Sequence, residues 1–246
     1  NAFLASERTG LKIIDVADPL NPTIIGGYDT GSNCAGLAVF GDIVYLATNE
    51  SGLQIVDISN PVEPQFIGSV DTPGLAIEVA LTGNTAYVAD GESGLQIIDV
   101  SNPSNPNIIG SVDTSGNAEG IAVNGNNVYI ADDESGLQII DITDPFNPNI
   151  IGSVDTIEDT KDVTVVGNIA YVADRTKGIQ VVDVRNPSNP QIIDSIGNVD
   201  ALDVKVIGNI AYIASYTNLV IASAPVEITP ISLDDPTRIS TTLKSP

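Results

Sequence analysis

The chain has 246 residues, and its 32 acidic and 9 basic side chains give a net charge of −23, which repels phosphate backbones and anionic lipid headgroups. We therefore expect no nucleic-acid partner, and because no apolar run reaches the roughly 18 residues of a membrane span, we expect no direct membrane insertion. Histidine, tryptophan and methionine are absent, which excludes Ser–His and Cys–His catalytic pairs and HExxH zinc sites.

The single cysteine and the first residue each suggest an interpretation. Cys34 excludes an intrachain disulfide and is most simply a small buried apolar group. The chain begins at Asn1, inside a repeated unit and without an initiator methionine. We therefore expect a processed or truncated piece of a longer protein.

A unit of 42 residues recurs along the chain. Its first residue is a glycine, found at Gly10, Gly52, Gly94, Gly136 and Gly178. A period of this length is typical of one supersecondary unit stacked several times. The unit contains four short stretches rich in Val, Ile, Leu and Tyr and bounded by turn residues, which predicts four strands. In the central copy these are residues 118–123, 127–132, 137–142 and 149–154.

The connections predict how the four strands pair. The first two strands are joined by Gly125-Asn126 and its counterparts, a two-residue loop that suits a type II′ hairpin. The connection before the fourth strand contains two prolines, such as Pro103 and Pro106, which places that strand at a sheet edge. No segment of 10–12 residues has helical periodicity, so the unit is an antiparallel meander.

These sheets are apolar on both faces, so copies must stack against one another. Radial stacking around an axis buries both faces and protects the edges, which predicts a β-propeller with the first strand innermost. A parallel β-helix is the alternative. An aromatic residue of the second strand recurs six times, which predicts six blades over residues 1–224: Phe3, Tyr45, Tyr87, Tyr129, Tyr171 and Tyr212. Blade 1 then lacks its first strand.

The third strand reads LQIID at 95–99 and 137–141, LQIVD at 53–57 and IQVVD at 179–183. These strands resemble the LVIVD-repeat propellers of bacterial and archaeal surface proteins. The resemblance implies the propeller fold and an extracellular or cell-surface location, and it implies no activity. The last residues, 225–246, resemble a linker into a following β-sandwich domain. Alternatively, residues 237–243 supply the missing strand of blade 1 and close the ring, or we expect that strand to have preceded Asn1.

Two sets of acidic residues occur at regular positions in the repeat. An aspartate ends the third strand of five blades (Asp15, Asp57, Asp99, Asp141 and Asp183), and we expect it to accept hydrogen bonds from backbone N–H groups in the following bend. The innermost strand begins with an acid in three blades, at Glu78, Asp162 and Asp203. These three could converge at the funnel to bind a cation or accept protons, with Glu119 and Lys161 at the same mouth. Solvated rim acids are the alternative.

The loops between the second and third strands carry a further group of acids. Acidic pairs could supply two or three oxygen ligands to Ca²⁺, although no loop matches the EF-hand pattern. The candidate residues are Asp90, Glu92, Asp132, Asp133 and Glu134. Solvated turns are the alternative interpretation.

Charge is divided unevenly along the chain. Residues 13–160 contain no Lys or Arg and 22 Asp and Glu, whereas all nine basic residues lie outside this range. We expect the acidic arc to face solvent and to recruit divalent cations. We expect a neighbouring domain or subunit to dock on the nearly neutral arc, through Arg175, Lys177, Arg185 and Lys205.

The sequence therefore predicts a non-catalytic, rigid binding or spacing module of a secreted or cell-surface bacterial protein, which mediates protein–protein or glycan contacts. The alternative is an enzyme that acts on extracellular polysaccharide with carboxylates in the funnel, with or without a metal. Two close acids in the funnel, one with a raised pKa, would favour the enzyme.

Overall fold

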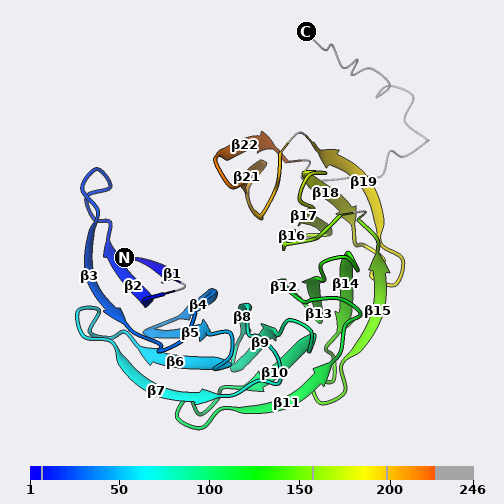
Figure 1. Cartoon of the computed structure of the whole chain (residues 1–246). Helices are drawn as coiled ribbons and strands as arrows, with labels where there is room; N and C mark the ends of the chain where they lie inside the picture. The colour runs from blue at the N-terminus through cyan, green and yellow to red at the C-terminus, as the bar shows by residue number, and fades with distance from the viewer. Residues whose placement is uncertain (7, 157, 198, 225–246) are drawn as a thin grey trace.

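The computed structural model describes residues 1–6, 8–156, 158–197 and 199–224. These residues form 22 β-strands, and none of the described residues belongs to a helix that could cross a membrane. The strands form six antiparallel sheets, which we call blades 1 to 6 in chain order (Figure 1). Blades 2 to 5 have four strands, and blades 1 and 6 have three.

Each complete blade runs from an inner strand near a common axis to an outer strand at the rim (Figure 1). The inner strands are β4 (Gly36–Phe40), β8 (Glu78–Thr82), β12 (Gly120–Asn124), β16 (Asp162–Val166) and β20 (Asp203–Ile207). The second strands are β1 (Ala2–Ser6), β5 (Ile43–Ala47), β9 (Thr85–Ala89), β13 (Asn127–Ala131), β17 (Ile169–Ala173) and β21 (Ile210–Ala214). The third strands are β2 (Gly10–Asp15), β6 (Leu53–Asp57), β10 (Leu95–Asp99), β14 (Leu137–Asp141), β18 (Ile179–Asp183) and β22 (Leu219–Ser223). The outer strands are β3 (Thr23–Tyr28), β7 (Gln65–Val70), β11 (Asn107–Val112), β15 (Asn149–Val154) and β19 (Gln191–Ile196).

This architecture is a six-bladed β-propeller with the predicted strand order. Blade 1 begins at its second strand, as the sequence predicts, and blade 6 ends at its third. The predicted closure of the ring by residues 237–243, and the alternative linker in residues 225–246, both lie outside the described residues.

The two predicted turns are confirmed by local geometry. In the hairpin after the inner strand, the first turn residue has φ of +58 to +61° and the second does not have positive φ, which is the type II′ form. In the bend after the third strand, Asp99 Oδ1 accepts the backbone N–H of Ser101 at 2.9 Å. The other four aspartates at this position accept the same bond, so these acids stabilise turns.

The inner strands begin later than predicted because the preceding residues make a different contact. Ala118 forms an isolated antiparallel bridge with Gly91, in the loop between the second and third strands of the preceding blade. Equivalent bridges form at the three other junctions between blades 2 and 6: Asn49–Ala76, Asp133–Thr160 and Arg175–Ala201. These bridges bring the two sets of loops to the same end of the propeller.

Apolar clusters between successive blades hold the propeller together. There are five such clusters for six blades, and each combines residues from two neighbouring blades. The repeated tyrosine is buried in them: Tyr45, Tyr87, Tyr129 and Tyr171 are at most 5% exposed. Cys34 is also buried, which raises the pKa of its thiol to about 11, so the predicted apolar role is confirmed.

A glycine in the outer strand fits closely against the next blade. A Cβ atom on Gly110 would lie 2.0 Å from the carbonyl oxygen of Pro145, in the bend between the third and outer strands of blade 4. Gly26, Gly68 and Gly152 meet the equivalent proline in the same way. Blade 5 has Asp194 at this position in β19, and blade 6 has no such bend within the described residues.

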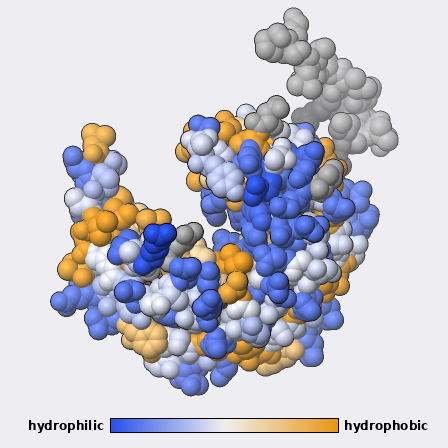
Figure 2. Space-filling view, viewed as in Figure 1, coloured by the Kyte–Doolittle hydropathy of each residue, from blue (hydrophilic) through white to orange (hydrophobic). Residues whose placement is uncertain are grey.

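The described blades do not form a closed ring. Blade 1 and blade 6 lie on either side of an opening (Figure 1), and the surface is hollowed between them (Figure 2). None of the five clusters of the described residues joins these two blades.

Candidate functional site

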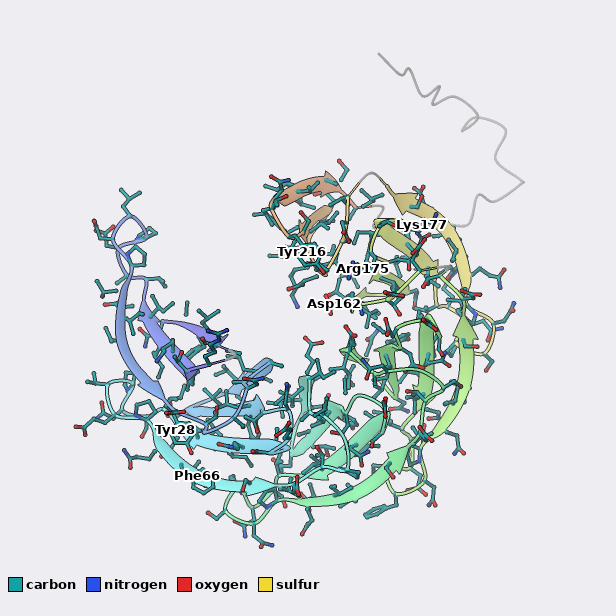
Figure 3. The ribbon with its side chains drawn as sticks, in the orientation of Figure 1. Tyr28, Phe66, Asp162, Arg175, Lys177 and Tyr216 are labelled. Atoms are coloured by element: carbon teal, nitrogen blue, oxygen red, sulfur yellow. The ribbon has the colours of Figure 1, made fainter. Side chains whose placement is uncertain are left out.

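The inner strands surround an axial pocket of about 600 Å³. Its charged lining comes from three acids and one cation: Glu78, Asp162 and Asp203, which begin β8, β16 and β20, and Lys205 in β20. Asp162 lies toward the central opening (Figure 3). The rest of the lining is mostly valine, alanine, leucine and isoleucine. The predicted convergence of the three funnel acids is therefore present in the structure.

Two of these carboxylates each accept a backbone hydrogen bond from the inner strand of the next blade. The backbone N–H of Ile121 donates to Glu78 Oε2 at 2.8 Å, and that of Val204 donates to Asp162 Oδ2 at 2.9 Å. Blade 4 begins its inner strand with Gly120, where a Cβ atom would lie 2.5 Å from the Cα of Asp162. The glycine thus leaves space beside the acid. These acids are built into the blade junctions, unlike freely solvated rim residues.

The pKa values of two pocket acids are raised. Burial by the surrounding strands raises the pKa of Glu78 to about 7; the negative charge of Asp203 adds to the shift, and the Ile121 N–H and Lys205 oppose it. Burial also raises the pKa of Asp162 well above its usual value, and the charges of Glu78 and Asp203 raise it further. The pocket therefore destabilises the charged forms of both acids, and a bound cation would relieve this.

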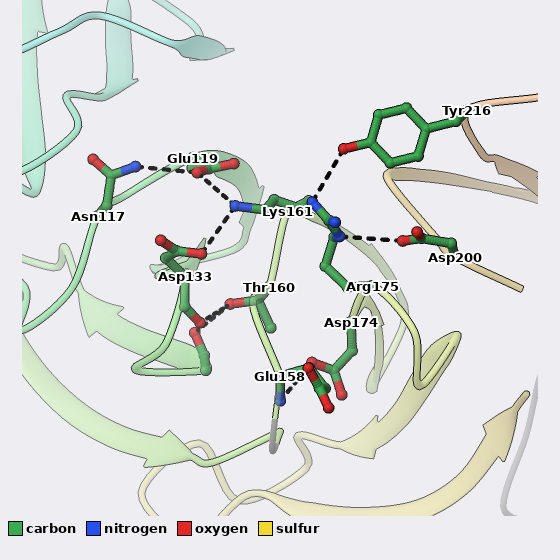
Figure 4. Close-up of polar contacts among 11 residues, drawn as sticks. Asn117, Glu119, Asp133, Glu158, Thr160, Lys161, Asp174, Arg175, Asp200 and Tyr216 are labelled. Carbon is green, nitrogen blue, oxygen red and sulfur yellow. Dashed lines mark hydrogen bonds and ion pairs between the residues drawn. The ribbon is translucent and has the colours of Figure 1, made fainter.

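Lys161 and Glu119, which the sequence places at the mouth of the funnel, do not line the axial pocket. Lys161 Nζ lies 2.8 Å from Glu119 Oε1 and 2.9 Å from Asp133 Oδ1, and Asn117 donates to the same Glu119 oxygen at 3.1 Å (Figure 4). Burial lowers the pKa of Lys161, but the two carboxylates outweigh it and the net shift is upward. Lys161 and Glu119 therefore link neighbouring blades and do not line the axial pocket.

The acidic loops do not assemble a metal site. Within the described residues, no three acidic, cysteine or histidine side chains are grouped so as to hold a metal ion. Asp90 and Asp132 are fully buried, and their carboxylates accept bonds from Thr72 and Gly74 and from Thr114 and Gly116, respectively. The loops do form a surface pocket of about 530 Å³, to which Glu92, Asp133 and Glu134 contribute. Two of the five proposed calcium ligands are thus used internally.

The four cations of the predicted docking surface are dispersed. Arg175 lies between blades 5 and 6, with Nε 3.1 Å from Asp200 Oδ1, and its guanidinium lies 5.4 Å from the ring centre of Tyr216 (Figure 4). Lys177 Nζ is 3.8 Å from Glu158 Oε1, near the same end of β18. Arg185 pairs with Asp183 at the opposite end of β18, and Lys205 lines the axial pocket. These residues do not form one surface.

At successive junctions a buried threonine donates a hydrogen bond to a buried aspartate, a contact that was not predicted from the sequence. Thr72 donates to Asp90, and Thr114 donates to Asp132. In both pairs the threonine lies 18 residues before the aspartate, and this constant spacing was the available signal. A third aspartate, Asp174, occupies the same position, and burial raises its pKa to about 6.

Comparisons with solved structures agree with the fold. The chain resembles the computationally designed Ika8 protein, with a TM-score of 0.70 and 10% identity, over 90% of this chain and 67% of that one. It also resembles a chain in a nidogen–laminin complex, with a TM-score of 0.65 and 14% identity, over 90% and 88%. A functionally unknown protein from Desulfotomaculum acetoxidans DSM 771 gives a TM-score of 0.65 and 13% identity, over 90% and 84%. These likenesses concern the fold alone.

Sequence comparisons assign the family. A search of the curated proteins finds no match. The family model of the LVIVD repeat matches residues 2–30, 32–72, 73–114, 115–156, 158–197 and 199–224. These six matches correspond to the six blades and include the third strands on which the predicted resemblance rests. The chain belongs to the LVIVD repeat family.

Proposed function

We propose that this propeller is a non-catalytic binding module that holds a basic side chain of a protein partner in its axial pocket. The observation that carries the proposal is the convergence of Glu78, Asp162 and Asp203 around one pocket in which Lys205 is the single cation of the lining. Glu78 and Asp162 are oriented by backbone hydrogen bonds, so they need little rearrangement on binding. The apolar lining suits the methylene groups of lysine or arginine.

The proposal is tested by calorimetric titration with N-acetyl-arginine amide, with its uncharged citrulline analogue as the ligand control. The arginine probe should bind at least about tenfold more tightly than the analogue. Replacing Asp162 and Asp203 together with asparagine should weaken binding by at least about tenfold. Asp113→Asn is the matched control, because it removes an exposed acid outside the pocket. Affinity that survives the double substitution would contradict the proposal.

Binding should also depend on pH with a known sign. The pKa of Glu78 is about 7, so its carboxyl is mostly protonated at pH 6 and mostly ionised at pH 8. A cationic probe should therefore bind up to about tenfold more tightly at pH 8 than at pH 6. In the Glu78→Gln variant this dependence should be reduced.

A carboxylate enzyme is the second candidate, because two close pocket acids have raised pKa values. Glycoside hydrolysis uses an acid with a raised pKa as its proton donor beside a second carboxyl group, and Glu78 and Asp162 both have raised pKa values. The test is the release of reducing ends from soluble xylan, laminarin and pullulan by the protein and by Glu78→Gln. Release that is lost in the variant would support the enzyme; no release from any substrate would leave the binding module.

The proposed setting is a secreted or cell-surface bacterial protein in which the propeller acts as a rigid spacer as well as a binding site. Five apolar junctions and the repeated backbone contacts support rigidity. The high acidity supports solubility outside the cell. Labelling of intact cells with a membrane-impermeant amine reagent tests the location, since the chain carries surface lysines such as Lys177.

A further inference from the structure

One hairpin near the axis carries a pair of residues that can react with each other. Asn124, the last residue of β12, is followed by Gly125, and this is the one Asn-Gly sequence in the chain. Both residues are exposed to solvent. The equivalent hairpins of the other blades have no asparagine at this position; the residues there are Phe40, Thr82, Val166 and Ile207. Blade 4 alone therefore places an amide side chain directly before the turn glycine.

The turn leaves the backbone nitrogen of Gly125 accessible. The pair formed by Asn124 and Asn127 closes the hairpin, so Gly125 lies in the two-residue turn, outside the hydrogen-bonded ladder. A Cβ atom on Gly125 would meet no atom of the described residues within 4 Å, so this side of the turn faces open space. Because glycine has no side chain, nothing hinders the approach of its nitrogen to the amide of Asn124.

The side-chain amide of Asn124 also links two neighbouring blades. Its Nδ2 donates a hydrogen bond to the carbonyl oxygen of Gly167 at 2.7 Å, and Gly167 is the first turn residue of the equivalent hairpin in blade 5. The bond therefore ties the inner hairpins of blades 4 and 5 together, beside the axial pocket to which the adjacent Val123 contributes. An amide nitrogen can donate this bond, whereas an ionised carboxylate only accepts hydrogen bonds.

We propose that Asn124 is a site of spontaneous deamidation, which loosens the junction of blades 4 and 5 as the protein ages. The backbone nitrogen of Gly125 attacks Cγ of Asn124 and loses its proton, and the side-chain nitrogen leaves as ammonia. The product is a five-membered succinimide ring. Water then opens the ring at either carbonyl and gives aspartate or isoaspartate. The reaction consumes one water molecule, releases one ammonia and does not depend on the ligand proposed for the axial pocket.

Both products break the link between the two hairpins. In the aspartate product, a carboxylate oxygen replaces Nδ2 and faces the carbonyl oxygen of Gly167, so a hydrogen bond is replaced by repulsion. In the isoaspartate product, the backbone passes through Cβ and Cγ and is one methylene group longer, so the pair of Asn124 and Asn127 can no longer keep its register. Each product also adds one negative charge to a chain whose net charge is already −23.

The other hairpins provide internal controls. Asn84 and Asn168 are turn residues of the equivalent hairpins in blades 3 and 5, and both are exposed, like Asn124. The residues that follow them are Thr85 and Ile169, whose β-branched side chains obstruct attack by the backbone nitrogen. If exposure alone controlled the reaction, all three asparagines would convert at similar rates. The following glycine makes Asn124 the reactive one.

The experiment incubates the whole folded chain at mildly alkaline pH and follows peptic peptides by mass spectrometry. Asn124 should convert to aspartate and isoaspartate at least about tenfold faster than Asn84 or Asn168. The conversion should release an equal amount of ammonia. Asn124→Thr, which introduces the residue that blade 3 has at this position, is the control and should release ammonia at least about tenfold more slowly, because it removes the reactive amide.

A second measurement tests the effect on the junction. Anion-exchange chromatography separates the aged, more acidic protein, which should melt at a lower temperature than fresh protein. Asn124→Asp should melt at a lower temperature than Asn124→Thr, because it places a carboxylate against the carbonyl oxygen of Gly167. The proposal is overturned if Asn124 stays an amide in the incubated chain, or if Asn84 and Asn168 convert as fast. It is also overturned if the deamidated protein melts at the same temperature as fresh protein.

Discussion

Gly110 shows how tightly the rim of the propeller is packed. The outer strand of blade 3 has no space for a side chain at this residue, because the carbonyl oxygen of Pro145 occupies the position of the Cβ atom. The contact joins backbone to backbone, so neither atom can move without shifting a strand or a proline-containing bend. The same contact recurs at Gly26, Gly68 and Gly152.

Gly110→Ala should therefore destabilise the fold, by about 2–4 kcal/mol, because either β11 or the bend at Pro145 must move. Gly197→Ala is the control: its Cβ atom would meet no atom within 4 Å, and its expected effect is within about 0.5 kcal/mol. Urea denaturation measures both. Equal stability of the two variants would show that the junction yields at little cost.

At this scale, the sequence predicts local contacts and misses distant ones. The aspartates that end the third strands could be assigned as turn acceptors, because their partner lies two residues away, as in Asp99 and Ser101. The bond from Thr114 to Asp132 spans 18 residues and joins two blades. This bond depends on how one blade is rotated relative to the next, and the repeated sequence does not predict that rotation. From the sequence, Asp90 and Asp132 were candidate calcium ligands or solvated turn residues, whereas the structure uses their carboxylates to bind Thr72 and Gly74, and Thr114 and Gly116.

At the scale of elements, the inner strands decide what the axial pocket contains. The sequence places an acid at the start of β8, β16 and β20, and the radial order of strands is enough to predict that they converge. The prediction placed Lys161 at the funnel and Lys205 on the docking surface, whereas in the structure Lys205 lines the pocket and Lys161 does not. Alternation along a strand would have corrected it: Lys205 is two residues from Asp203 and shares its side, whereas Lys161 is adjacent to Asp162 and points the other way.

The inner strands and their loops make stability depend on pH. The folded-state pKa is about 7 for Glu78 and about 6 for Asp174, and both exceed the values near 4 of an unfolded chain. At a pH between the unfolded and the folded pKa values, the folded protein binds more protons than the unfolded chain does. Its free energy of unfolding should therefore fall as pH rises from about 5 to about 7.5. The pKa values of Asp57, Asp99 and Asp141 are lowered, so stability should also fall below about pH 4.

Thermal unfolding between pH 3 and pH 8 measures this profile, and a maximum near pH 5 is expected. Glu78→Gln and Asp174→Asn each remove one raised pKa, so each should flatten the decline above pH 5. A melting temperature that rises steadily up to pH 8 would contradict the raised pKa values.

At the scale of the whole molecule, charge is the dominant feature. Residues 13–160 carry 22 acids without a single cation, and their mutual repulsion opposes the compact state. The five apolar junctions hold the acidic blades together against this repulsion. The uneven distribution of charge along the chain could be predicted fully from the sequence, because it depends only on the order of residues. Whether the acidic side chains of the loops are grouped closely enough to bind an ion could not be predicted, because it depends on how the loops are placed in space.

Divalent cations should stabilise the propeller by screening this repulsion. The described residues offer no three-residue metal site, so the effect should not distinguish between divalent ions of different size. Millimolar Ca²⁺ and Mg²⁺ should raise the melting temperature equally, and both more than Na⁺ at equal ionic strength. A larger shift with Ca²⁺ than with Mg²⁺ would indicate a specific calcium site.

The glycine–proline contact at the rim has a consequence for how such a chain can change over generations. The contact joins a backbone carbonyl to a glycine of the neighbouring blade, so it does not depend on which side chains occupy the variable positions of the repeat. A gene segment encoding one 42-residue unit can therefore be duplicated, deleted or exchanged with another, and the new neighbours still fit. Blade number and the residues lining the axis can then diverge separately, with the junctions left unaltered.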